Sequence, residues 1–167
     1  MKTAITILIL LPTWLFAQST NEIPEWGFER FKKHMPDEIF KIGEFVDPLF
    51  LEADFTGDGN EDLAIPIERK DNGKKGILIL CKSENTHFLA GGGNTFGPGG
   101  NDFKWLDIWS VNNDEITYGT TFYSNGDIKG TEEVRLGHAA ISVREEEGSG
   151  GLIYYDGEKF VWIHQGD

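Results

Sequence analysis

Cysteine, basic residues and long apolar runs are all scarce in this chain of 167 residues. Cys81 is the only cysteine, so no intramolecular disulfide braces the fold, although small exported domains commonly rely on one. Lys and Arg together number 15 against 28 Asp and Glu, which gives a formal net charge of −13. Such an excess of negative charge argues against binding to nucleic acid or to anionic membrane surfaces. It is compatible with a bound cation, a basic protein partner or simple solubility.

An apolar stretch lies at the N-terminus. Residues 1–17 begin with the positive Lys2 and end on the small Ala17, which is the pattern of a secretory signal peptide cleaved before Gln18. A membrane anchor needs about 20 apolar residues, and Pro12 interrupts this shorter run. We therefore expect a secreted or periplasmic protein with no membrane insertion after cleavage. Loss of Lys2 changes the formal charge by one unit, to −14.

Residues 18–167 are long enough for one domain with a hydrophobic core. A short helix is expected over residues 24–34, because Phe28, Phe31 and Met35 recur at helical spacing before Pro36. The remaining pattern is one of strands and turns, with a glycine-rich loop over residues 91–100. The expected strands are residues 49–51, 62–68, 76–82, 87–90, 104–111, 115–122, 132–136, 139–144, 152–155 and 158–163. This predicts a mostly β fold, an antiparallel meander, sandwich-like or partial-barrel domain with one short N-terminal helix.

The last two strands surround an Asp156-Gly157 turn, whose residues tolerate positive φ angles. A two-residue turn there predicts that Tyr155 faces Glu158 and that Ile153 faces Phe160. Both faces of this hairpin are then apolar. One face carries Ile153, Tyr155, Phe160 and Trp162, and the other carries Leu152, Tyr154, Val161 and Ile163. We expect the hairpin to be buried on both sides, the alternative being an exposed aromatic surface.

The segment from Asp54 to Leu63 is the strongest indication of a binding site. Calcium prefers six to eight oxygen ligands, which short loops deliver from alternating positions. Asp54, Asp58 and Asp62 stand at positions 1, 5 and 9 of the loop, and the intervening glycines let the backbone curl. The predicted calcium ligands are the side chains of Asp54, Thr56, Asp58 and Asp62 and the backbone carbonyl of Asn60. A plain turn between two strands is the alternative.

A helix-loop-helix calcium site is excluded, because Ile65 stands where that site needs a bidentate glutamate. The segment Asp54-Phe55-Thr56-Gly57-Asp58-Gly59-Asn60-Glu61-Asp62-Leu63 resembles instead the strand-loop-strand calcium loop of FG-GAP/VCBS repeats, whose pattern is close to D-x-N-G-D-G-x-x-D-L. Thr56 departs from that pattern. The resemblance covers under a tenth of the chain in a single copy, so a complete propeller of several blades is excluded. It implies a calcium ion that braces the loop of an extracellular module.

Catalytic motifs are not apparent in the sequence. Ser149 lacks the outer glycine of a nucleophile elbow, and Cys81 lies in an apolar run where we expect a buried, unreactive thiol. The histidines do not form a metal-binding motif; they are His34, His87, His138 and His164. We therefore expect no enzymatic activity.

The leading prediction is a secreted, calcium-braced, non-enzymatic binding or structural module. An inhibitor of a basic secreted enzyme, for example a lysozyme, is an alternative that the negative charge supports through electrostatic steering. A secreted hydrolase is a second alternative. Trp105 and Trp109 are expected in the core, the other possibility being a sugar- or peptide-binding strip that includes Trp162. The partner would then be an unknown protein or a glycan.

Overall fold

The structure, a computed structural model, describes residues 22–166, which form mostly antiparallel β-strands and one helix. The signal peptide expected over residues 1–17 lies outside the described residues, as do the first residues of the domain expected over 18–167. No helix within residues 22–166 is long and apolar enough to cross a membrane. The mostly β, sandwich-like prediction is confirmed, and the sheets do not close into a barrel.

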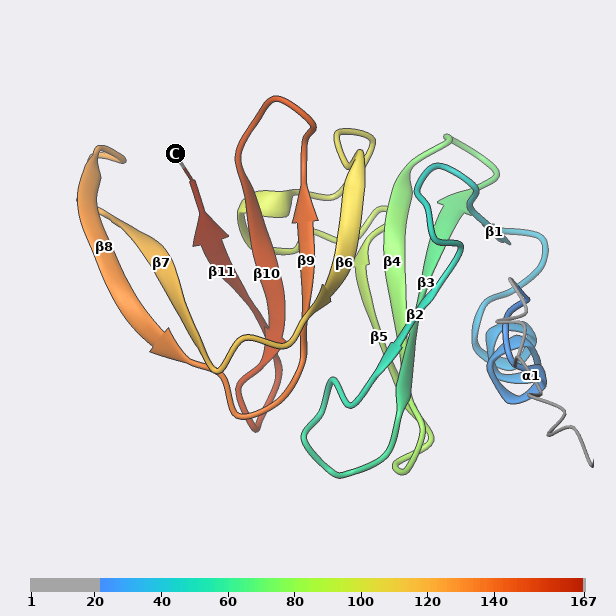
Figure 1. Cartoon of the computed structure of the whole chain (residues 1–167). Helices are drawn as coiled ribbons and strands as arrows, with labels where there is room; N and C mark the ends of the chain where they lie inside the picture. Colours follow the sequence, from blue (N-terminus) through green and yellow to red (C-terminus); the bar gives the residue numbers. More distant parts are fainter. Residues whose placement is uncertain (1–21, 167) are drawn as a thin grey trace, which may run out of the picture.

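The elements follow one another as α1 (Glu25–His34), β1 (Phe40–Ile42), β2 (Leu51–Ala53), β3 (Asp62–Arg69), β4 (Lys75–Cys81), β5 (Thr86–Gly91), the 3-10 turn η1 (Gly97–Gly99), β6 (Ile108–Asn112), β7 (Ile116–Phe122), β8 (Ile128–Arg135), β9 (Ala140–Arg144), β10 (Gly150–Tyr155) and β11 (Phe160–Gln165). The first sheet has the order β1-β3-β4-β5, with β2 also pairing β3. The second sheet has the order β11-β10-β9-β6. Strands β7 and β8 lie between β6 and β9 in the sequence, but in space they form a separate two-stranded sheet beside β11 (Figure 1).

The main core lies between the two larger sheets. Strand β4 contributes Ile77 and Ile79, and β9 and β10 contribute Ile141 and Ile153, all of them fully buried. Strands β3 and β4 are buried on both faces and therefore read as nearly continuous apolar runs. Burial of apolar area at this interface is the main stabilising term of the fold.

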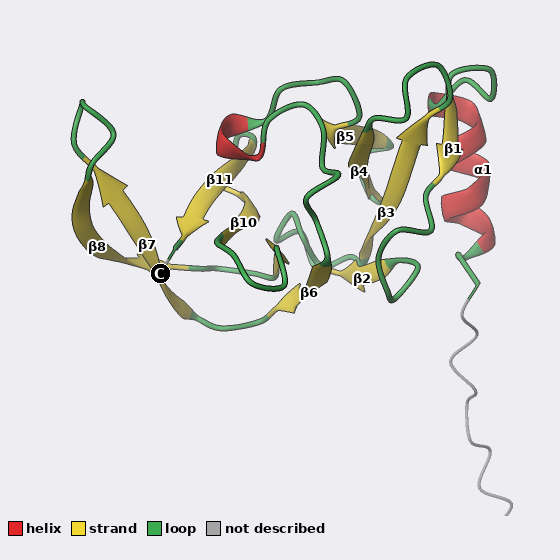
Figure 2. Cartoon of the chain, turned by 90° about the horizontal axis from the view of Figure 1, so that it is seen from above, coloured by secondary structure: helices red, strands yellow, loops and turns green. Residues whose placement is uncertain are grey.

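Helix α1 covers the opposite face of the first sheet. Phe31 and Met35 pack with the β3 and β4 side chains that point away from the main core, such as Leu63 and Leu78. The helix begins after Pro24 and ends at His34, close to the predicted bounds, because Pro36 prevents its continuation. Figure 2 shows α1 and the β7–β8 hairpin at opposite ends of the molecule.

The predicted pairing of the last hairpin is wrong by two residues. Tyr155 pairs with Phe160 and Ile153 with Trp162, because the loop contains four residues instead of two. The Asp156 carboxylate accepts hydrogen bonds from the amides of Glu158 and Lys159, both at 2.9 Å, and so holds the wider loop. A shift of two residues leaves each side chain on its predicted face. Both faces pack against hydrophobic clusters, but burial is incomplete, because Tyr154, Tyr155 and most of β11 are only partly buried.

Three other expectations differ from the structure. The expected strand 104–111 begins only at Ile108, and β8 begins at Ile128, before the expected residue 132. Strand β1 was not expected; its three residues pair with the end of β3. The glycine-rich segment is a loop as predicted, and it contains η1.

Candidate functional site

Asp62, the last predicted calcium ligand, is fully buried, and its oxygens are occupied by protein donors. Its Oδ2 accepts hydrogen bonds from the amides of Phe55 (3.1 Å) and Thr56 (3.0 Å) and from the Thr56 hydroxyl (2.9 Å). Its Oδ1 accepts a hydrogen bond from the amide of Lys82 at 2.9 Å. Burial raises the pKa of Asp62 above its usual value, and the hydrogen bonds from Lys82 and Thr56 offset only part of this increase. Three of the four donors thus converge on Oδ2 and one reaches Oδ1, so protein groups contact both oxygens of the carboxylate.

Asp54 and Asp58 likewise bind the amides of their own loop. The Asp54 carboxylate accepts hydrogen bonds from the amides of Gly57 (2.6 Å), Asp58 (3.1 Å) and Gly59 (2.9 Å). The Asp58 Oδ1 accepts the amide and side-chain N–H groups of Asn60 at 2.8 and 3.0 Å, and its Oδ2 accepts the Ser83 hydroxyl. The Ser83 hydrogen bond, followed by those of Asn60, lowers the pKa of Asp58.

These contacts do not form a calcium cage. The Thr56 hydroxyl, predicted as a ligand, donates a hydrogen bond to Asp62. The Asn60 side chain donates one to Asp58, whereas the ligand predicted at that position is the backbone carbonyl. Within residues 22–166, no group of three acidic, histidine or cysteine side chains is placed to hold a metal ion. The residues as arranged do not fit calcium, because Asp62 binds the amides of Phe55, Thr56 and Lys82 and does not converge with Asp54 and Asp58 on one point. Calcium binding stays a prediction of the sequence pattern.

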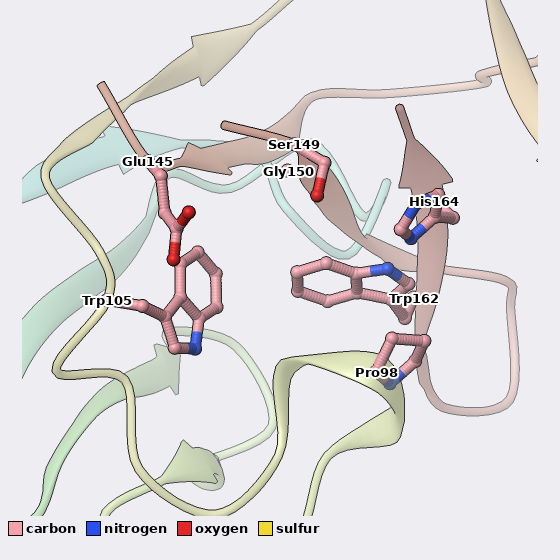
Figure 3. A pocket seen from close by; sticks show the side chains of 7 residues that line it. All are labelled: Pro98, Trp105, Glu145, Ser149, Gly150, Trp162 and His164. Atoms are coloured by element: carbon pink, nitrogen blue, oxygen red, sulfur yellow. The ribbon is translucent and has the colours of Figure 1, made fainter. Parts of the chain in front are cut away.

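A second site is a pocket of about 180 Å³ on the second sheet (Figure 3). Figure 3 shows two indole rings, a carboxylate and a hydroxyl around one hollow. The lining residues are Pro98, Trp105, Glu145, Ser149, Gly150, Trp162 and His164. The two indoles meet edge to face, with 6.1 Å between ring centroids and an angle of 80° between planes. Trp105 and Trp162 therefore present surfaces in two directions to a ligand in the hollow.

The loop between β5 and β6 positions Trp105. Its indole N–H donates a hydrogen bond to the carbonyl of Gly99 at 3.0 Å, which fixes the ring against η1. The ring also packs against Phe103, whose own side chain is fully buried. Hydrogen bonding and packing thus orient Trp105 before any ligand arrives, which lowers the entropic cost of binding.

Trp162 lies flat on the neighbouring strand. A Cβ at Gly151 would overlap its indole, so glycine is needed there for the ring to approach the β10 backbone. The indole nitrogen of Trp162 and Nδ1 of His164 are both shielded from solvent and have no hydrogen-bond partner. Buried polar groups in proteins are ordinarily hydrogen bonded, so these two nitrogens are exceptions.

The structure brings together further residues that were not linked by their spacing. His34 of α1 and His87 of β5 lie with ring centroids 4.6 Å apart, on the face of the first sheet that α1 covers. The Trp105–Trp162 pocket was also not predicted as such, because its lining comes from three separate segments.

Cys81 is buried as predicted, and burial raises the pKa of its thiol to about 11. It is therefore a poor nucleophile at neutral pH.

Comparison of this chain with known protein families, with curated proteins and with solved structures found no match.

Proposed function

We propose that this chain is an exported, non-enzymatic binding module that holds a sugar unit of a glycan in the tryptophan pocket. The observation that carries the proposal is the crossed pair of Trp105 and Trp162 beside the carboxylate of Glu145. Sugar rings have apolar C–H faces and hydroxyl edges. Indole faces cover the apolar C–H faces of a sugar. Carboxylate and hydroxyl oxygens accept hydrogen bonds from the sugar hydroxyl groups.

The size and polarity of the pocket support a small polar ligand. A volume of about 180 Å³ is below the several hundred Å³ typical of drug-sized sites and suits one ring of a longer chain. Glu145 and Ser149 are exposed at the β9–β10 loop, so they are accessible to hydroxyl groups of the ligand.

Binding is favoured over hydrolysis because the pocket is lined by one carboxylate. Glycoside hydrolysis ordinarily needs an acid and a second carboxylate about 5–10 Å apart. Glu145 is the one acidic residue among those that line the pocket. The hydrolase alternative therefore lacks a partner group at this site.

Calcium has no role in this proposal, because the acidic loop is closed by its own amides. Export rests on the N-terminal sequence pattern alone.

The experiment is a binding screen of the chain lacking residues 1–17 against soluble polysaccharides and oligosaccharides of glucose, galactose, mannose and N-acetylglucosamine. Titration calorimetry and tryptophan fluorescence give two readouts. We expect Trp105→Ala to weaken binding at least tenfold and Glu145→Gln to weaken it several-fold. Glu147→Gln, in the same loop but outside the pocket, is the matched control. Absence of binding across the screen, or equal binding by Trp105→Ala and the parent, would overturn the proposal.

A further inference from the structure

The β7–β8 hairpin carries most of the exposed apolar surface of the described chain. Seven large hydrophobic residues within residues 22–166 are exposed, and five of them belong to this hairpin or its turn. They are Ile116 (39% exposed), Tyr118 (61%), Phe122 (43%), Tyr123 (57%) and Ile128 (62%). A concentration of this kind marks a surface that contacts another molecule, whereas single exposed apolar residues have no such meaning.

The register of the hairpin places Ile116, Tyr118, Phe122 and Ile128 on one face, whereas Tyr123 lies in the turn. At the end of this face the Phe122 ring contacts His164 of β11, with 5.0 Å between ring centroids. Ile116 and Tyr118 alternate along β7, and Phe122 pairs directly with Ile128. The other face packs against the rest of the domain. Thr117 and Gly119 are buried there, and Gln165 of β11 donates a hydrogen bond to the Thr117 hydroxyl. Tyr118 and Ile128 are therefore open to solvent on the outer face, while the inner face anchors the hairpin. The hairpin projects from the end of the molecule opposite α1 (Figure 2).

The charges around this face are mainly negative. Asp114, Glu115 and Asp127 lie at the ends of the hairpin, and Glu132 and Glu133 lie on β8, against only Lys129 and Arg135. Glu133 pairs with Tyr118 of the outer face, whereas Glu132 pairs with Gly119 of the inner face. Arg135 is already paired with Glu133 at 3.0 Å. An apolar centre with an acidic rim is complementary to a surface in which apolar residues alternate with Lys and Arg.

The free edge of β8 is unsuited to pairing with another strand. Lys129 forms a bulge opposite Thr121, and Gly130 has a φ of 152°, so the edge is kinked. Bulges and charged residues at an edge oppose strand addition. A second copy of this chain is opposed too, because each copy has a formal charge of −13. The partner should therefore approach the outer face and should be basic.

We propose that the outer face of the β7–β8 hairpin binds a basic protein segment in which lysine or arginine alternates with apolar residues. Tyr118 and Ile128 supply the apolar anchors, and the surrounding carboxylates supply attraction and orientation. This surface adjoins the tryptophan pocket, because the Phe122 ring contacts the pocket residue His164. Tyr118 and Ile128 do not line that pocket, so the two proposals rest on different residues.

The probe is a soluble peptide that alternates lysine with valine and tyrosine, compared with a peptide in which glutamate replaces every lysine. Affinity is measured by titration calorimetry, and the contact region by hydrogen exchange. We expect the lysine peptide to bind at least tenfold more tightly than the glutamate peptide, more weakly at high salt, and to protect the amides of β7 and β8. The double variant Tyr118→Ser/Ile128→Ser should lose at least tenfold in affinity.

Phe28→Ser is the matched control, because Phe28 is 43% exposed but lies on α1 at the other end of the molecule. It should leave affinity for the lysine peptide unchanged. Thermal unfolding checks that each variant is folded; all three positions are exposed, so little loss of stability is expected. Equal binding of the two peptides, or unchanged binding by the double variant, would overturn the proposal. So would sedimentation showing that the chain dimerises through this face and that Tyr118→Ser/Ile128→Ser restores the monomer.

Discussion

The Asp62 carboxylate accepts a hydrogen bond from the backbone amide of Lys82 at 2.9 Å and thereby joins the acidic loop to the end of β4. Its other oxygen accepts three hydrogen bonds, from the backbone amides of Phe55 and Thr56 and from the Thr56 hydroxyl. A fully buried carboxylate is unfavourable unless hydrogen bonds compensate for its lost hydration. Asp62 therefore acts as the structural centre of the loop, without needing a bound ion.

Replacement of Asp62 should destabilise the protein strongly. Asp62→Asn places an amide N–H₂ against the donors of Phe55 and Thr56 or of Lys82, so at least one buried donor loses its acceptor. We expect the free energy of unfolding to fall by about 2–4 kcal/mol, measured by urea denaturation. Glu61→Gln is the control, because the exposed neighbour makes none of these contacts, and its effect should stay within about 0.5 kcal/mol. A similarly small loss in Asp62→Asn would contradict this role.

The fold was largely predictable because the strands carry clear local signals. Asp156-Gly157 marked the last turn, and the apolar alternation of β10 and β11 placed each side chain on its correct face. The exact pairing was missed because the Asp156 carboxylate holds a four-residue loop, which dipeptide statistics do not reveal. Strand β1 was missed because three residues at a sheet edge carry too little periodicity.

The candidate sites were less predictable. Residues 54–63 marked a special loop, but whether Asp62 points toward an ion or toward the amide of Lys82 depends on β4, 20 residues away. The pocket formed by Trp105, Glu145 and Trp162 depends on how three distant segments pack. An unusual content of tryptophan was the one available signal, and it did not distinguish core positions such as Trp109 from pocket positions.

Calcium titration tests the sequence prediction directly. Because the loop carboxylates are already hydrogen bonded, we expect 5 mM calcium chloride to change the melting temperature no more than sodium chloride of equal ionic strength. Extracellular sites of this kind bind at about 10⁻⁴–10⁻³ M, so an occupied site would add roughly 1–2 kcal/mol at this concentration. A calcium-specific rise that disappears in Asp58→Ala would establish the ion in the loop and contradict our expectation.

A side chain at Gly151 should disrupt the tryptophan pocket. In Gly151→Ala the new methyl group overlaps the indole of Trp162, and the ring has to move off β10. We expect a loss of about 1–3 kcal/mol in the free energy of unfolding and a shift in tryptophan emission. In the control Gly137→Ala, the only neighbour within 4 Å of the new Cβ is the Tyr154 hydroxyl at 3.7 Å. That variant should be neutral or stabilised by up to about 1 kcal/mol. Unchanged emission and stability in Gly151→Ala would contradict the packing described.

The His34–His87 contact should make stability depend on pH. Burial is the main cause that lowers the pKa of His34 from its usual 6.5, and the positive charges of His87, Lys33 and Arg30 lower this pKa further. Between the lowered pKa and 6.5 the unfolded chain binds more protons than the folded chain, so the free energy of unfolding decreases as the pH falls through this window. Above pH 6.5 His34 therefore does not reduce the free energy of unfolding, and the reduction appears as the pH falls below 6.5.

Urea denaturation between pH 7.5 and 5 measures this dependence. We expect His34→Gln to lose less stability on acidification than the parent, because the glutamine does not take up a proton. His87→Gln removes one of the charges that oppose protonation of His34, so its curve should lie between those of the parent and His34→Gln. Parallel pH curves for the parent and His34→Gln would show that His34 does not couple protonation to folding. The difference between the curves isolates this histidine from carboxylates that titrate at lower pH.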